Sequence, residues 1–394
     1  MPSRSQRCAV VALISAWVVA GPGCERKPSH QSRCALPIAD NGSLGRSASL
    51  ARALALPTDL LVGVGNDLLG NGFEAHAWEL SPPPPLHYLY LVGLPGRGGW
   101  PEWNSGGSFI DKHVDAARAR CVVPAFTLYA MASDGEGDPK TFADPAYMTD
   151  WWTGYHLALA RLAATDTPAL LHIEPDLLGF LQQKTSASPA LIPAVVGQAV
   201  PACTDLDDTL VGWTACVQRR ARTVAPKVKL GFHASTWADP SPSEVGRFLV
   251  DAGVHSGSTD SLFVETLDRD AGCFEAGTLH CTRDDGPWYW DVTNRTSPNF
   301  AEHLEVVQTL HQMTGLPLIW WQMPHGVPSL VEGGRHRRFR DNRVSYFFDH
   351  PEEFVEAGGA AVLFGPGWVG QTDLGSDGGY FDSRWSAYVA PSLP

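Results

Sequence analysis

Eight short apolar runs, each followed by turn residues and then by a longer amphipathic stretch, constrain the fold of this 394-residue chain most strongly. The runs are LLVGVG (60–65), LHYLYLVG (86–93), CVVPAFTLY (121–129), PALLHIE (168–174), VKLGFHA (228–234), SLFVET (261–266), PLIWWQM (317–323) and AAVLFG (360–365). Strands that alternate with helices form parallel βαβ units, and eight such units favour a closed barrel over an open sheet. We therefore predict an α/β fold, a single-domain (β/α)₈ TIM barrel that forms the catalytic domain over residues 56–394.

The N-terminal region has the plan of an export signal. Arg4 and Arg7 precede an apolar segment at 9–20, which is too short to be a permanent membrane span. We predict a secretory signal peptide over residues 1–24 and a disordered tether over residues 25–55, which are rich in Ser, Arg, Pro and Gly. Cys24 resembles the cysteine of a bacterial lipoprotein cleavage site, which implies membrane attachment through a lipidated Cys24 as the alternative to secretion. The expected location is therefore outside the cell or on the bacterial cell envelope.

The cysteines fit this location. Cys203 with Cys216 and Cys273 with Cys281 are close pairs, which in an oxidising compartment are typical of disulfides that fix loops. Cys121 lies in an apolar run, which predicts a free buried thiol. No CxxC or HExxH spacing occurs, so the motifs predict neither a metal centre nor another cofactor.

The charge balance argues against a nucleic-acid partner. The formal net charge is −13, and the longest basic run is GRHRRFR at 334–340. Binding to a polyanion needs a larger basic surface than this run can supply.

The C-terminal ends of the predicted strands carry polar residues, and this is where (β/α)₈ barrels place their active sites. Residues two apart on a strand face the same side, so His172, Glu174 and Asp176 are predicted to line one face. By the same rule Glu265 shares a face with Phe263, and Gln322 with Trp320. A carboxylate pair from neighbouring strands suits glycosidic bond cleavage, because one member can protonate the leaving oxygen while the other acts as base or nucleophile.

We therefore take Glu174, Asp176 and Glu265 as the candidate catalytic residues. Burial and mutual repulsion would raise the pKa of one member of the pair. The alternative for Glu174 and Asp176 is a set of helix caps and salt bridges at the end of the barrel.

Aromatic and polar residues near the strand ends suit sugar binding, because indole faces stack on sugar rings and N–H groups bond hydroxyls. The candidate substrate-binding residues are Trp100, Trp103, His172, His233, Trp237, Asp268, Asp270, Gln322, His325 and Trp368. Asp268 and Asp270 flank Arg269, so a loop-holding ion-pair network is the alternative for them.

Two other functions use the same residues. His172 and His233 with a carboxylate would make a metal-dependent hydrolase, such as a carbohydrate deacetylase. A non-catalytic carbohydrate-binding surface protein would use the same end of the barrel.

Several blocks of the sequence resemble a group of exported bacterial (β/α)₈ proteins described as glycoside-hydrolase-like. The blocks are YLYLVGLPGRGGWPEWNSGGSFI, HIEPDLLGFLQQ, FVETLDRDAG, IWWQMPHGVP, DNRVSYFF and AVLFGPG. The resemblance spans nearly all of the predicted barrel. It implies a glycoside hydrolase that acts on a polysaccharide or oligosaccharide.

Two enzyme groups resemble the fourth strand alone, and they assign its acids differently. The EPD of residues 174–176 is similar to the motif of the family-six cellulases, where the aspartate is the proton donor of an inverting reaction; this implies that Asp176 is the acid. In the large clan of retaining (β/α)₈ glycosidases, a glutamate before proline at the end of strand four is the acid/base, which implies Glu174. That clan also has a nucleophilic glutamate on strand seven, where this chain has Gln322. In that scheme Glu265 would have to take the role of the nucleophile.

Overall fold

A computed structural model describes residues 47–56, 60–67, 73, 75–132, 136–284, 286–328, 333–335 and 337–389. These residues belong to one compact unit. The predicted signal peptide and Cys24 lie outside the described residues, as does most of the predicted tether. No helix within the described ranges combines the length and apolarity that a membrane span requires.

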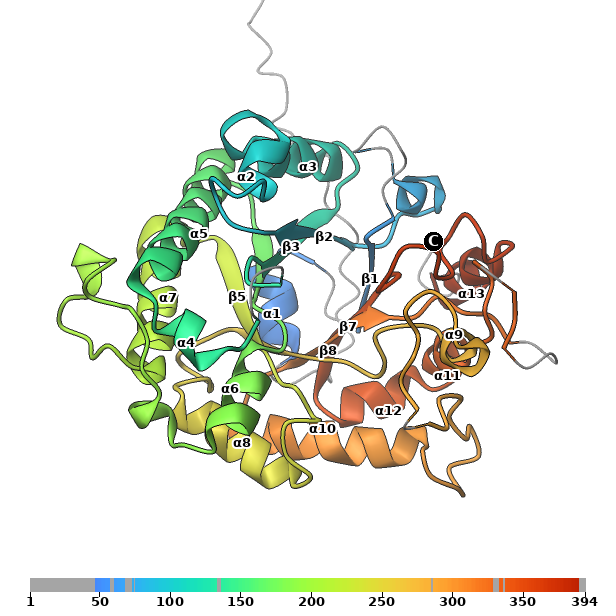
Figure 1. Cartoon of the computed structure of the whole chain (residues 1–394). Coiled ribbons are helices and arrows are strands. Elements are labelled where there is room, and N and C mark those ends of the chain that lie inside the picture. The colour runs from blue at the N-terminus through green and yellow to red at the C-terminus, as the bar shows by residue number, and fades with distance from the viewer. Residues whose placement is uncertain are drawn as a thin grey trace, which may run out of the picture. The chain divides into compact units, whose positions relative to one another are not determined.

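Eight parallel strands close into a barrel, which confirms the predicted (β/α)₈ fold (Figure 1). Each strand pairs with its sequence neighbours, and β1 pairs with β8 to close the ring. The strands are β1 (Leu61–Gly65), β2 (Leu86–Val92), β3 (Val123–Tyr129), β4 (Ala169–Ile173), β5 (Val228–His233), β6 (Ser261–Val264), β7 (Leu318–Met323) and β8 (Gly359–Phe364). Each of the eight apolar runs of the sequence therefore corresponds to one strand, with β8 beginning one residue before its run.

Helices surround the ring of strands in Figure 1. The α-helices are α1 (Ser47–Ala53), α2 (Trp100–Trp103), α3 (Phe109–Arg118), α4 (Pro139–Phe142), α5 (Pro145–Thr165), α6 (Leu177–Thr185), α7 (Leu210–Val224), α8 (Pro242–Asp251), α9 (Ala271–Ala276), α10 (Phe300–Thr314), α11 (Arg343–Asp349), α12 (Pro351–Glu356) and α13 (Tyr380–Val389). The 3₁₀ helices are η2 (His76–Glu79), η3 (Ser105–Gly107), η4 (Pro189–Leu191) and η5 (Pro201–Cys203). Between β1 and β2 the described residues form no helix other than η2.

Side-chain caps fix the starts of the long crossover helices. The side chains of Asp144, Thr209 and Asn299 accept backbone N–H bonds at the starts of α5, α7 and α10. Such a bond satisfies one of the N–H groups that a helix leaves free at its first turn. The helix α10 ends at Gly315, whose left-handed conformation suits glycine.

An apolar cluster fills the inside of the barrel, and α1 closes its N-terminal end. Leu50 of α1 and Leu54, which follows the helix, are buried in the same cluster as Leu86 of β2 and Ile319 of β7. In Figure 1, α1 lies at the centre of the ring of strands. Part of the expected tether, residues 47–55, is therefore folded, because these leucines cover apolar surface at the bottom of the barrel. The helix α13 returns to this end as well, where Tyr388 Oη donates to the Leu60 carbonyl oxygen at 3.2 Å.

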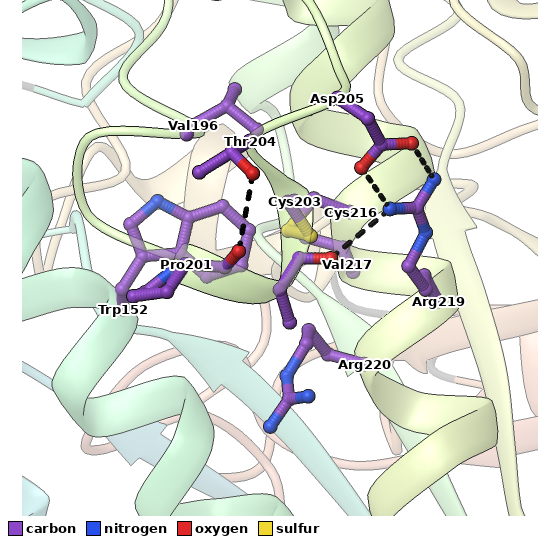
Figure 2. Close-up of a disulfide and its surroundings, with 12 residues drawn as sticks. Trp152, Val196, Pro201, Cys203, Thr204, Asp205, Cys216, Val217, Arg219 and Arg220 are labelled. Atoms are coloured by element: carbon purple, nitrogen blue, oxygen red, sulfur yellow. Dashed lines mark hydrogen bonds and ion pairs between the residues drawn. A yellow bond between two sulfur atoms is a disulfide. The ribbon is translucent and has the colours of Figure 1, made fainter.

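Both predicted disulfides are confirmed. Cys203 bonds to Cys216 across 13 residues, and Cys273 bonds to Cys281 across 8 residues. Figure 2 shows the first, which joins η5 to α7 beside the ion pair between Arg219 and Asp205. Cys121 is disulfide-bonded too, so the expectation of a free thiol is wrong. Such bonds are typical of proteins in oxidising, extracellular compartments.

Candidate active site

The backbone leaves the strand conformation at the end of β4, and this separates the two acids of the EPD sequence. Glu174 and Asp176 have φ values of 37° and 66°, on either side of Pro175. Left-handed conformations cost non-glycine residues roughly 1–3 kcal/mol each and persist where the surroundings enforce them. Because strand geometry stops at Ile173, the expected common face of His172, Glu174 and Asp176 does not form.

Glu174 is buried against the segment that follows β3. Its Oε1 accepts from Ala130 N at 3.1 Å and Trp151 Nε1 at 2.5 Å, and its Oε2 accepts from Met131 N at 3.2 Å. Burial raises the pKa of Glu174 to about 8, although these three donors oppose the shift. Glu174 therefore joins the end of β3 to α5 through hydrogen bonds.

Asp176 lies instead beside residues from β5 and β6. Ser235 Oγ donates to Asp176 Oδ1 at 3.3 Å, and His233 Nε2 lies 3.8 Å from the same oxygen. The side chain of Asp176 is 22% exposed, so solvent and substrate can reach it. One donor atom each from Asp176, His233 and Glu265 lies within 4.8 Å of the other two. The structure thus brings together Asp176 and Glu265, two of the three predicted catalytic acids.

Glu265 follows β6 directly and is half-buried. Burial raises its pKa well above the usual range, and the nearby carboxylates of Asp176 and Asp268 raise it further. Two carboxyl groups this close cannot both ionise at low cost, so Glu265 keeps its proton to a higher pH than an ordinary glutamate does.

Two histidines form a stacked layer beneath this pair. The His172 ring stacks on Phe263 with 3.9 Å between centroids and an angle of 7°, and the His233 ring lies 5.3 Å from His172. Gly231 leaves room for Phe263, since a Cβ at Gly231 would lie 2.4 Å from its ring. Burial lowers the pKa of both histidines, so both rings are neutral at pH 7.

Tyr90 and Trp321 continue the layer toward β2 and β7. The Tyr90 ring lies 5.7 Å from Trp321, whose ring meets His172 edge-on at 5.0 Å. Tyr90 Oη, Trp321 Nε1 and His172 Nε2 have no hydrogen-bond partner among the described residues. Burial raises the pKa of Tyr90 well above its usual range, so its hydroxyl keeps its proton and can donate.

Sequence reasoning missed two groups at this end of the barrel. Tyr90 could have been recognised, because Tyr88 and Tyr90 alternate in the β2 run and so share the inner face. Glu136 could not, since it lies in the segment after β3 without a motif. Burial raises the pKa of Glu136 to about 7, while a hydrogen bond from Tyr129 lowers it and the charge of Asp176 raises it.

Asp268 and Asp270 were both candidate substrate-binding residues, but their side chains lie in different surroundings. Asp268 Oδ2 pairs with Arg269 Nη1 at 2.5 Å, and Asp268 is one of the charges that raise the pKa of Glu265. Asp270 is buried, and its Oδ2 accepts from Thr372 N at 2.8 Å. Burial, together with the charge of Asp341, raises the pKa of Asp270 to about 8. Asp270 therefore holds loops together, whereas Asp268 forms a carboxylate cluster with Asp176 and Glu265.

We expected Gln322 and Trp320 to share a face of β7, but they do not. The β7–β8 register shifts between Trp320 and Met323, and Gln322 has a φ of 59°. Trp320 packs outside the barrel, where its Nε1 bonds His303 Nε2 at 2.9 Å. Trp321 takes the inner position instead.

Some of the predicted substrate-binding residues are exposed and others are buried. Trp103, Trp237 and Trp368 are exposed. Trp100 and His325 are fully buried, His325 between Phe364 and Phe381. Their burial does not fit direct contact with a substrate.

Comparison with known proteins does not assign this chain to a family. Neither a protein-family model nor a curated protein matches this chain. Similar solved structures include an endo-1,4-β-D-mannanase from Thermotoga petrophila RKU-1 (10% identity, 84% of this chain and 99% of that one, TM-score 0.48). Another is xylanase B from Clostridium stercorarium F9 (14% identity, 80% of this chain and 88% of that one, TM-score 0.41). A third is D-psicose 3-epimerase from Clostridium cellulolyticum H10 (11% identity, 84% of this chain and 98% of that one, TM-score 0.43). At such identities and scores, activity does not transfer.

Proposed function

We propose that this protein is a glycoside hydrolase that cleaves glycosidic bonds of a polysaccharide or oligosaccharide with Asp176 and Glu265. The observation that carries the proposal is the approach of their carboxyl oxygens to within 4.8 Å at the C-terminal end of the barrel. The raised pKa of Glu265 supports it, because such a pair supplies one proton and one negative charge.

The positions favour Glu265 as the acid and Asp176 as the nucleophile, the reverse of the roles expected from the EPD resemblance. Asp176 Oδ would attack the anomeric carbon while the bond to the leaving oxygen breaks and Glu265 gives that oxygen its proton. A water would then cleave the resulting ester, with its proton passing to Glu265 and Asp176 leaving as carboxylate. Carboxyl groups about 5–5.5 Å apart are typical of retaining enzymes, and about 6.5–9.5 Å of inverting ones. The short separation therefore supports retention.

The layer beneath the pair offers donors for sugar hydroxyls. The Tyr90 residue is half-buried, and its Oη is buried and unpartnered among the described residues. The neutral His233 lies beside Asp176. Trp321 packs against Tyr90 and is itself packed against His172. We propose that Tyr90 orients the sugar ring at the scissile bond and that the buried His233 positions Asp176.

The test is hydrolysis of a panel of polysaccharides by the wild type and by Asp176→Asn and Glu265→Gln. We expect both variants to lose activity and the first-formed sugar to keep its anomeric configuration, as read by proton NMR. Asp115→Asn on α3 and Glu305→Gln on α10 are matched controls, because both side chains are exposed on helices. Full activity of either active-site variant would overturn the assignment.

A metal-dependent hydrolase, such as a carbohydrate deacetylase, is the second candidate. Asp176, His233 and Glu265 could each give one ligand to a metal ion, because their donor atoms lie within 4.8 Å of one another. His172, expected among the ligands, is outside this group, and its Nδ1 lies 3.3 Å from Thr127 Oγ1. Metal analysis of purified protein and inhibition by a chelator would favour this candidate. Activity unchanged by a chelator in metal-free protein would favour the glycosidase.

A further inference from the structure

An exposed tryptophan stands in the segment between β8 and α13, which packs against the carboxylate cluster. Trp368 is 45% exposed. The neighbouring Gly367 has no room for a side chain, since a Cβ there would lie 1.6 Å from the Asp268 carbonyl oxygen and 2.7 Å from Gln322 Nε2. The segment that carries Trp368 is therefore fixed against Asp268 and Gln322.

Side chains from the segment between β6 and α9 and from the segment after α9 contact the indole ring. The Arg269 guanidinium lies 5.4 Å from the Trp368 ring centroid and pairs with Asp268. His280 meets the ring edge-on at 5.3 Å. A chain of direct contacts thus runs from Trp368 through Arg269 to Asp268, whose charge acts on Glu265.

A cavity of about 410 Å³ opens beside Trp368. Its walls include Asn66, Leu279, Arg337, Val369 and Asp373. This volume lies in the range of about 300–1,000 Å³ that small-ligand sites occupy. An indole next to an amide and an ion pair is the combination that sugar rings need, with an apolar face and hydrogen-bonding groups at its edge.

The charges around this cavity favour an uncharged sugar over an acidic one. Arg269 is paired with Asp268, and Arg337 is paired with Asp373 at 2.7 Å. Both guanidinium groups beside Trp368 are therefore already neutralised. The Asp176 carboxylate, whose charge reaches Asp268, would repel an acidic sugar.

A second exposed tryptophan lies on another side of the carboxylate pair. Trp237 follows β5, is 38% exposed and packs on Phe180 with 4.7 Å between centroids. Ser235, two residues before it, bonds Asp176. Trp237 thus adjoins the Asp176 side of the pair, and Trp368 adjoins the Asp268 side, three strands further around the barrel.

We propose that Trp368 and its cavity form a distal subsite for a sugar ring of an uncharged polysaccharide, so that the enzyme cleaves bonds inside the chain. This inference rests on the proposed function and specifies its substrate class. A glycan bound on both sides of the carboxylates has rings beyond the scissile bond in each direction, as endo-cleavage requires.

The first test compares Trp368→Ala with the wild type on a polymer and on a short aryl glycoside of the same sugar. We expect KM for the polymer to rise about tenfold, which corresponds to about 1.4 kcal/mol. We expect kcat/KM for the short substrate to stay unchanged, and Trp368→Phe to restore most of the polymer KM. Leu191→Ala, which truncates a 75% exposed side chain on η4, is the control. An unchanged polymer KM and product pattern in Trp368→Ala would overturn the subsite.

Affinity electrophoresis separates this inference from the proposed function. Neutral and uronic-acid polysaccharides are cast in the gel, and retardation of Glu265→Gln is compared with that of Glu265→Gln/Trp368→Ala. We expect neutral polymers alone to retard the single variant, and the added Trp368→Ala to weaken retardation several-fold. Retardation without hydrolysis by the wild type would reject the glycosidase but keep the subsite. No retardation in any gel, or equal retardation of both variants, rejects the subsite.

Discussion

Glu174→Gln should destabilise the protein without removing its activity. Three N–H donors point at the two oxygens of Glu174: Ala130 N and Trp151 Nε1 at Oε1, and Met131 N at Oε2. An amide nitrogen cannot accept a hydrogen bond. In one orientation of the glutamine Met131 N loses its partner, and in the other both remaining donors lose theirs. One unsatisfied buried donor costs about 1–3 kcal/mol, so we expect the free energy of unfolding to fall by at least that amount.

Asp176→Asn should remove activity with little change in stability. Asp176 is partly exposed and accepts one bond from Ser235, so its loss should change the free energy of unfolding by about 0.5 kcal/mol or less. Hydrolysis should fall roughly 10³-fold, because the nucleophile is gone.

Urea unfolding with the disulfides intact, followed by tryptophan fluorescence, measures the free energy of unfolding of both variants. Initial rates at 25 °C, normalised to folded protein, measure their hydrolysis. Glu305→Gln is the control for stability. The roles assigned to the two acids are refuted if Glu174→Gln unfolds at the wild-type urea concentration but is inactive, or if Asp176→Asn keeps its turnover.

Asp268→Asn should move the alkaline limb of the kcat/KM profile to lower pH, because it removes a negative charge that raises the pKa of Glu265; movement to higher pH would contradict Glu265 as the acid. Tyr90→Phe should lower kcat/KM about tenfold by removing one hydrogen bond to the sugar, while the midpoint of unfolding stays within error, since Tyr90 Oη has no partner among the described residues. Leu54→Ala should cost about 2–5 kcal/mol of unfolding free energy in a urea titration, because Leu54 is buried where α1 closes the barrel; a change below about 0.5 kcal/mol would show that α1 is not part of the core.

The barrel could be predicted from the sequence because its signals are local. Seven of the eight strands lie within an apolar run, and β8 begins one residue before its run. Turn residues and helix caps such as Thr209 and Asn299 lie between the runs. The short spacings of the cysteine pairs were a similarly local signal. The helix α1 gave no such signal. Its sequence, SASLARA, looks like a tether, and only the apolar end of the barrel explains its burial.

The candidate site was less predictable because it depends on departures from regular strands. The rule that residues two apart share a face fails at Glu174 and Asp176, and again at Gln322, since all three have positive φ. These torsions bury Glu174 and bring Asp176 toward Glu265. Exposure is also a tertiary property, so position after a strand end could not distinguish the buried Trp100 from the exposed Trp368.

The closure of the barrel by α1 has a practical consequence for display and immobilisation. Ser47, where α1 begins, and Val389, where α13 ends, belong to helices that both contact the bottom of the barrel. A surface linker or affinity tag joined at either of these ends would therefore attach opposite Asp176 and Glu265. The carboxylate end would face outward, where a bulky polymer chain could approach it without steric hindrance from the support.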